Sequence, residues 1–104
     1  MADSTREFQE SPVEQGKDER VSYTIDTALY GATVAPTGIA VYLYEGDTTD
    51  ISATNLSGTY SLVGLVISTP LVISLTPGKL YRLEVQFVIS GNTVEPYGYI
   101  LGKY

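Results

Sequence analysis

Alternating apolar and polar residues run through most of the chain after residue 20, and this period of two predicts β-strands. The clearest strand is Lys79–Ser90, in which apolar side chains alternate with Arg82, Glu84 and Gln86. Val21–Thr27 alternates in the same way, which is typical of a strand with one buried face. Gly38–Glu45 has apolar or aromatic residues on both faces. It is therefore expected either to be central or to meet a partner with its second face.

Glycine, proline and short polar runs divide the rest of this region into further short strands. These are Thr33–Val34, Ile51–Leu56, Thr59–Ser68, Leu71–Leu75 and Thr93–Leu101. Gly91-Asn92 predicts a two-residue hairpin turn, and Pro96 favours an edge position for the last strand. About seven short strands without an amphipathic helix predict an all-β domain over residues 21–104, an antiparallel β-sandwich or barrel.

The segment from Leu75 to Val85, LTPGKLYRLEV, sharpens this choice. It resembles the L-x-P-G-x-x-Y-x-V-x-V segment of fibronectin type III and related immunoglobulin-like domains. In that family the tyrosine hydroxyl bonds to nearby backbone where the chain passes between sheets. The resemblance implies this corner role for Tyr81, with Leu75 as a core residue beside the Pro77-Gly78 turn. Because the chain has no tryptophan, which fibronectin type III domains usually place in the core, we expect a general immunoglobulin-like sandwich.

Residues 1–20 differ in composition from the rest of the chain. They contain half of the 6 basic and 12 acidic residues, and Phe8 and Val13 are their large apolar residues. Too little apolar surface is available there to offset chain entropy, so residues 1–20 are predicted to form an extended polar arm. We expect this arm to contact a neighbouring molecule, with Phe8 and Val13 as apolar anchors and charges such as Arg6 setting the register.

The composition narrows the possible functions. The chain has 104 residues, no cysteine, no histidine and a net charge of −6. Histidine-based and cysteine-based nucleophilic sites cannot be built, so neither an enzyme nor a cofactor is expected. Binding to nucleic acid is not expected, because it requires basic residues that displace phosphate counterions. A membrane span is not expected either, because Pro70 interrupts the longest apolar segment.

The acidic loop after Gly38–Glu45 is a candidate metal site. Glu45, Asp47 and Asp50 are carboxylates of the type that bind Ca²⁺. Their spacing matches no established calcium loop, and a solvated hairpin tip explains the same residues. We leave both interpretations open.

Tyrosine is in excess, with nine of the eleven aromatic residues. By alternation, Tyr42 and Tyr44 share one face of a strand, and so do Tyr97 and Tyr99. If the two strands lie in one sheet, these side chains form an aromatic strip opposite the core. Such a strip fits either a binding interface, where tyrosine is enriched, or an ordinary half-exposed sheet.

The junction from Lys17 to Asp26, KDERVSYTID, resembles the K-D-x-x-E-x-x-x-Y-x-I-D opening of short head-associated and tail-adjacent bacteriophage proteins. The closing hairpin, from Tyr81 to Tyr99, is similar to theirs as well. Thr27 stands where an aromatic residue often follows the aspartate, and the spacing within KDER is shorter. The resemblance implies a compact β-sandwich with a polar N-terminal extension that assembles on the virion.

Three functional hypotheses follow from these patterns. The first is a capsid decoration (cement) protein, made in the host cytoplasm, that binds the major capsid protein or neighbouring virion subunits as a homo-oligomer, with a trimer favoured. The second is a head-to-tail or fibre adaptor of the phage neck. The third, of a different class, is a carbohydrate-binding or adhesion module that uses the tyrosine strip.

Overall fold

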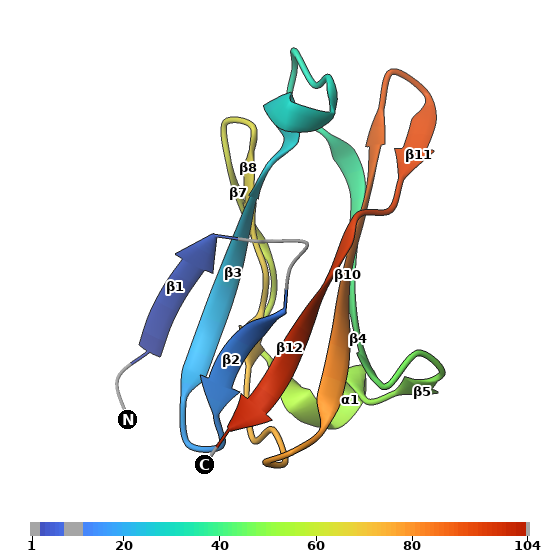
Figure 1. The fold of residues 1–104 in the computed structure, drawn as a ribbon. Coiled ribbons are helices and arrows are strands. Elements are labelled where there is room, and N and C mark those ends of the chain that lie inside the picture. Colours follow the sequence, from blue (N-terminus) through green and yellow to red (C-terminus); the bar gives the residue numbers. More distant parts are fainter. Residues whose placement is uncertain (1–2, 8–11, 104) are drawn as a thin grey trace.

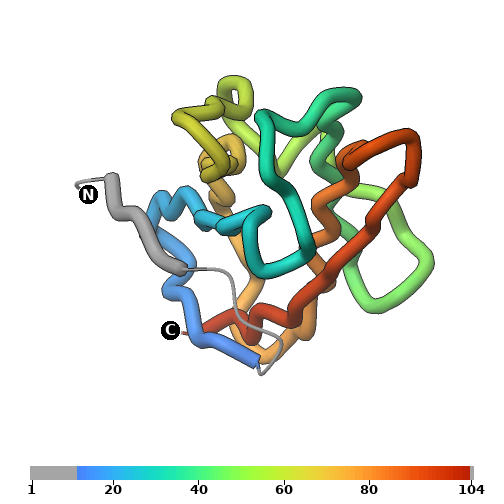
Figure 2. Tube along the Cα trace, turned by 90° about the horizontal axis from the view of Figure 1, so that it is seen from above, coloured from blue at the N-terminus to red at the C-terminus, as the bar shows by residue number. Residues whose placement is uncertain are grey.

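The computed structural model describes residues 3–7 and 12–103, and within them the chain forms two facing β-sheets of six strands each (Figure 1). The first sheet contains β1 (Asp3–Glu7), β3 (Arg20–Asp26), β6 (Leu56–Ser57), β7 (Ser61–Val63), β8 (Val66–Ser68) and β9 (Leu71–Val72). The second contains β2 (Val13–Gly16), β4 (Thr37–Glu45), β5 (Thr49–Asp50), β10 (Leu80–Ile89), β11 (Asn92–Val94) and β12 (Tyr97–Lys103). The short helices η1 (Thr27–Tyr30) and α1 (Ser52–Asn55) connect strands. Figure 2 shows the two layers from one end.

The predicted all-β fold of two sheets is confirmed, and the strongly alternating segments form β3, β4 and β10. The strand count exceeds the predicted seven, because proline and glycine interrupt several strands. Pro70 separates β8 from β9, although both pair with β3. Proline has no amide hydrogen for the ladder, so the pairing stops there.

Several weaker predictions were wrong. Thr33–Val34 is not a strand, and Ile51–Leu56 contains the helix α1. The hairpin loop lies one residue earlier than predicted, because β10 ends at Ile89 and β11 begins at Asn92. The last strand is not at an edge: β12 begins after Pro96 and pairs with both β10 and β2.

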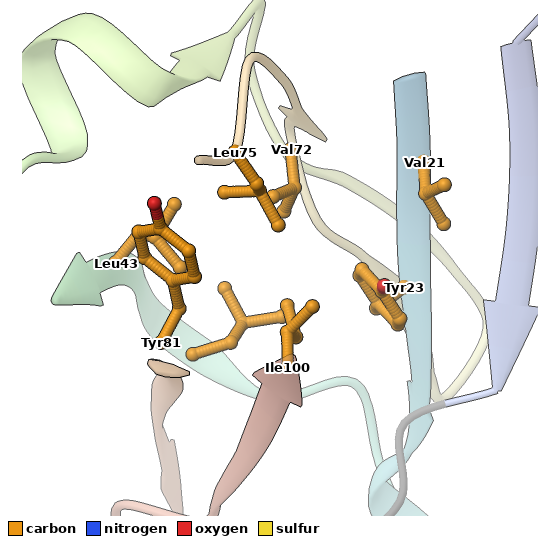
Figure 3. Close-up of a cluster of buried hydrophobic side chains, with 8 residues drawn as sticks. Val21, Tyr23, Leu43, Val72, Leu75, Tyr81 and Ile100 are labelled. Carbon is orange, nitrogen blue, oxygen red and sulfur yellow. The ribbon is translucent and has the colours of Figure 1, made fainter. Parts of the chain in front are cut away.

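The core lies between the sheets in two clusters of buried side chains. The larger one contains Val21, Tyr23, Leu43, Val72, Leu75, Tyr81, Leu83 and Ile100. Figure 3 shows these side chains pointing into the space between the layers. The smaller one contains Ile25, Ile67, Val85 and Phe87. Apart from Leu75, which lies between β9 and β10, these residues are apolar members of the strands, so one face of each sheet is removed from water.

The N-terminal segment is part of the sandwich, in contrast to the predicted extended arm. β1 pairs in parallel with β3, and β2 pairs in parallel with β12. Val13 packs against the larger core cluster, and Gln15 is fully buried. Main-chain hydrogen bonds form the ladder irrespective of side-chain polarity, so a polar segment can complete a sheet edge.

The chain passes from the first sheet to the second between β9 and β10, over residues 73–79. Leu75 is fully buried there, and the backbone N–H of Thr76 donates to the Tyr81 hydroxyl at 2.8 Å. Gly78 turns the chain with a φ of 84°, in the left-handed region that favours glycine. Tyr81 thus makes the type of contact that the immunoglobulin-like resemblance implies.

Replacing Tyr81 with phenylalanine is expected to lower the free energy of unfolding by about 1 kcal/mol, because Thr76 N–H loses this acceptor. Chemical denaturation of the variant would measure the effect. Tyr60→Phe is the matched control, since Tyr60 is 43% exposed. Equal stability of the two variants would contradict a structural role for the Tyr81 hydroxyl.

Candidate functional site

The outer face of the second sheet gathers aromatic and charged side chains across three neighbouring strands. We call this set the tyrosine surface, and its members are Tyr42, Tyr44, Arg82, Glu84, Tyr97 and Tyr99. The ladder fixes their arrangement: Arg82 lies opposite Tyr44 and Tyr99, and Glu84 lies opposite Tyr42 and Tyr97. Alternation along β4, β10 and β12 places all six side chains on the face away from the core.

Arg82 is at the centre of the tyrosine surface. Its guanidinium carbon lies 4.7 Å from the Tyr44 ring centroid and 5.7 Å from that of Tyr97, within range of cation–π attraction. The guanidinium also lies 3.8 Å from the Asp47 carboxylate and 3.6 Å from that of Glu84. Rings and carboxylates therefore hold a planar, permanently charged group in one place on the sheet.

The predicted tyrosine pairs are confirmed, but they do not form one continuous strip. The ring centroids are 6.4 Å apart for Tyr42 and Tyr44 and 5.7 Å apart for Tyr97 and Tyr99. Strand β10 lies between the two pairs, and Arg82 connects them. Alternation along Lys79–Ser90 places Arg82 on the face opposite the core, but the sequence did not predict Arg82 as a site residue.

Two hydroxyls of the tyrosine surface have raised pKa values. For Tyr44 the main cause is partial removal from water, followed by the negative charges of Glu84 and Asp50. For Tyr99 the causes are again removal from water and then Asp47, whose carboxylate accepts a hydrogen bond from the Tyr99 hydroxyl at 3.3 Å. Both hydroxyls therefore remain protonated at neutral pH and can donate hydrogen bonds.

The three carboxylates of the acidic loop have separate partners. Glu45 pairs with Lys79, and Asp47 lies near Arg82 and Tyr99. Asp50 accepts a hydrogen bond from the Ser52 backbone at 2.9 Å, and hydrogen bonding to Ser52 lowers its pKa. In residues 3–7 and 12–103, no three acidic side chains are grouped as a metal ion would require. The described residues thus do not support the calcium interpretation.

A hollow of about 350 Å³ lies at one side of the tyrosine surface. Its lining residues are Tyr30, Glu95, Pro96, Tyr97 and Tyr99. Tyr30 comes from η1 and packs edge-on against Phe87, with ring centroids 5.9 Å apart. Tyr30 and Glu95 were not predicted as site residues, because neither belongs to an alternating pattern of aromatic residues.

The other residues predicted to contact a partner do not join this surface. Arg6 belongs to β1 in the first sheet, and Phe8 lies outside the described residues. Val13 packs against the core, since β2 turns its side chain inward beside β12. Its prediction as an anchor for another molecule is therefore corrected.

No protein family matches the chain, and no curated protein is significantly similar to it. In the described part of the chain, no helix has the length and apolar character needed to cross a bilayer.

Proposed function

We propose that the chain is a non-enzymatic virion structural protein that decorates a bacteriophage capsid and attaches through its tyrosine surface. The observation behind this proposal is the arginine-centred group of four tyrosines on one sheet face. Tyrosine and arginine are enriched at the centres of protein interfaces, where they account for much of the binding energy. The likeness of Lys17–Asp26 and of the closing hairpin to phage proteins supports the virion setting.

The side chains of the tyrosine surface are also preorganised, because contacts within the surface hold them in place before a partner binds. Arg82 lies over the Tyr44 ring and between carboxylates, and Tyr99 donates a hydrogen bond to Asp47. Side chains that are already ordered lose less conformational entropy when a partner binds. A capsid subunit or a sister copy in a small oligomer would supply carboxylates or carbonyls to Arg82 and the tyrosine hydroxyls.

An immunoglobulin-like strand order is part of the proposal. β8 and β9 both pair with β3. β7 pairs with β8, and β6 pairs with β9. The strands β8 and β9 therefore act as one interrupted strand, and β6 and β7 act as another. With the couples joined, one sheet runs β1, β3, β8/β9, β6/β7, and the other includes β4, β10 and β12 in that order. This order supports an arrangement like that of the immunoglobulin constant-type sandwich. The parallel β1–β3 pairing departs from it.

The sequence predicted attachment through the N-terminal segment, whereas we propose attachment through the tyrosine surface. β1 and β2 pair within the sandwich, and Val13 and Gln15 contribute to its interior. A deletion of residues 1–20 would remove these contacts and so could not separate attachment from folding. Substitutions on the tyrosine surface can separate the two.

Two alternatives remain beside decoration. A head-to-tail or fibre adaptor would use the same surface at another place on the virion. A carbohydrate-binding module would need open ring faces on which sugars stack, and Arg82 already lies over the Tyr44 ring, 4.7 Å from its centroid. The geometry therefore favours a protein partner.

Cryo-electron microscopy of phage particles purified from the source of this chain would test the proposal. Density repeated over the icosahedral shell, with the tyrosine surface against the capsid protein, is the expected result. Density confined to the neck or fibre base would overturn decoration in favour of the adaptor. Absence of the chain from every particle would overturn a virion role.

Replacing Tyr42 and Arg82 together with alanine is expected to weaken particle binding by about tenfold or more, because the guanidinium at the centre of the tyrosine surface and one of its four rings are lost. Co-sedimentation of purified variants with particles stripped of the chain would measure this. Tyr60→Ala is the matched control, because it removes a 43%-exposed tyrosine outside the tyrosine surface. Unchanged binding of the double variant, in a protein that is still folded, would show that attachment uses another face.

A further inference from the structure

We propose that the hollow beside the tyrosine surface is a binding site for a cationic group, in a virion the lysine or arginine side chain of the partner protein. This inference rests on the proposed function and names the chemistry of its partner. Among the described residues, the hollow is lined by tyrosine rings and by the carboxylate of Glu95, and none of the lining residues is basic. Aromatic ring faces and carboxylates both attract positive charge.

The rings of the hollow form a corner. Tyr97 and Tyr99 are nearly perpendicular, with an interplanar angle of 82° and a centroid separation of 5.7 Å. Tyr30 lines the hollow as well, and its ring is supported by Phe87 in the core. A cation seated in such a corner meets the π-systems of more than one ring, which is how aromatic cages select quaternary ammonium and similar groups.

The carboxylate of the hollow is held in position from the neighbouring strand. The side-chain amide of Gln86 donates to Glu95 Oε1 at 2.7 Å. The carbonyl of Pro96 accepts from the Val85 backbone N–H at 3.0 Å, which fixes the segment between β11 and β12. The site is therefore ordered before a ligand arrives, and binding costs little additional side-chain entropy.

Charge and size both favour a small cation. The chain has a net charge of −6, so a cation approaches an attractive field. The Arg82 guanidinium lies 5.7 Å from the centroid of the Tyr97 ring, but Asp47 and Glu84 neutralise it at 3.8 Å and 3.6 Å. A volume of about 350 Å³ lies at the lower end of the range of ligand pockets, which suits a single side chain or headgroup.

Titration of the full-length, ¹⁵N-labelled protein with choline, followed by NMR, tests this inference without any phage particle. Choline is the probe because its trimethylammonium group carries the charge, and 3,3-dimethylbutan-1-ol is its neutral counterpart of the same shape. We expect choline to shift the amide signals of Tyr97, Gly98 and Tyr99, with a dissociation constant about 3- to 10-fold lower than that of the neutral alcohol. Methyl glucoside, an uncharged sugar, is titrated in the same way to test whether the hollow binds carbohydrate.

Two substitutions assign the effect to the hollow. Glu95→Gln keeps the shape and removes the charge, so it is expected to weaken choline binding about threefold or more. Asp18→Asn removes the same charge from an exposed turn and is expected to leave binding unchanged. An equal effect of both variants would show that net charge, and not the site, attracts choline, and would overturn the proposal.

The remaining outcomes also decide the question. Equal binding of choline and the neutral alcohol would make the hollow an apolar pocket, and binding of methyl glucoside alone would make it a sugar site; either overturns the proposal, as does the absence of any binding. Choline binding by a chain that no particle contains would support the cation site and overturn the virion role. A capsid decorated by this chain, together with no response to choline, would support the virion role and overturn the cation site.

Discussion

Replacing Gly102 with alanine is expected to lower the free energy of unfolding by about 3 kcal/mol or more, as overpacking at a rigid contact does. A Cβ atom at this position would lie 2.2 Å from the Thr76 carbonyl oxygen and 3.0 Å from its carbonyl carbon. Backbone atoms cannot rotate away as the end of a side chain can. The turn between Thr76 and Lys79 would have to move away from β12.

That movement would break hydrogen bonds on both sides of the contact. Gly78 N–H donates to the Gly102 carbonyl at 2.9 Å, and Gly102 N–H donates to the Lys79 carbonyl at 2.9 Å. The same turn precedes Tyr81, so the corner between the sheets would be disturbed as well. The loss of stability in Gly102→Ala is therefore expected to exceed the cost of the steric overlap with the Thr76 carbonyl alone.

Thermal unfolding followed by circular dichroism measures the Gly102→Ala effect, and a fall in Tm of roughly 15 °C corresponds to about 3 kcal/mol in a domain of this size. Gly64→Ala is the control. Gly64 has a φ of 60° and open space around its Cβ position, so alanine there meets backbone strain alone, about 1 kcal/mol. A Gly102→Ala variant as stable as Gly64→Ala would have lost only about 1 kcal/mol, and it would show that the turn moves aside without the expected loss of hydrogen bonds.

The strands with strict alternation could be predicted from the sequence, because one buried face requires a period of two. Val21–Thr27 and Lys79–Ser90 correspond to β3 and β10 to within a residue or two. β2 could not be predicted, since Glu14, Gln15 and Gly16 show no apolar pattern. Its place is set by the main chain of β12 and by the burial of one amide side chain, and neither leaves a local signal.

The candidate site was predictable only in part, for a similar reason. Alternation placed Tyr42 with Tyr44 and Tyr97 with Tyr99, as the structure confirms. The position of Arg82 between the two pairs depends on the register of three strands that are distant in sequence. Tyr30 reaches the hollow from η1, a single turn whose orientation depends on the fold around it. Long-range pairing, and not local pattern, completes the site.

Replacing Gln15 with leucine is expected to lower the free energy of unfolding by about 3 kcal/mol, although leucine is apolar and the position is fully buried. Gln15 Nε2 donates to the Val72 carbonyl at 2.8 Å and to the Glu19 carbonyl at 3.2 Å. Its Oε1 accepts from the Tyr23 hydroxyl at 2.9 Å. One side chain of β2 thereby joins the second sheet to β3 and β9 of the first. Leucine would deprive buried polar groups of these partners.

A double-mutant cycle with Tyr23→Phe separates this explanation from a simple loss of packing. Phenylalanine removes the hydroxyl that Gln15 accepts from, so the double variant should be about 1 kcal/mol more stable than the sum of the single effects predicts. Glu14→Gln is the neighbouring control: it removes an exposed ion pair with Lys103 and should change stability by about 0.5 kcal/mol or less. Strict additivity of Gln15→Leu and Tyr23→Phe in urea denaturation would contradict the hydrogen-bonded link. Coupling of the expected size would show that the polar segment Val13–Gly16 is joined to the first sheet through the interior of the sandwich.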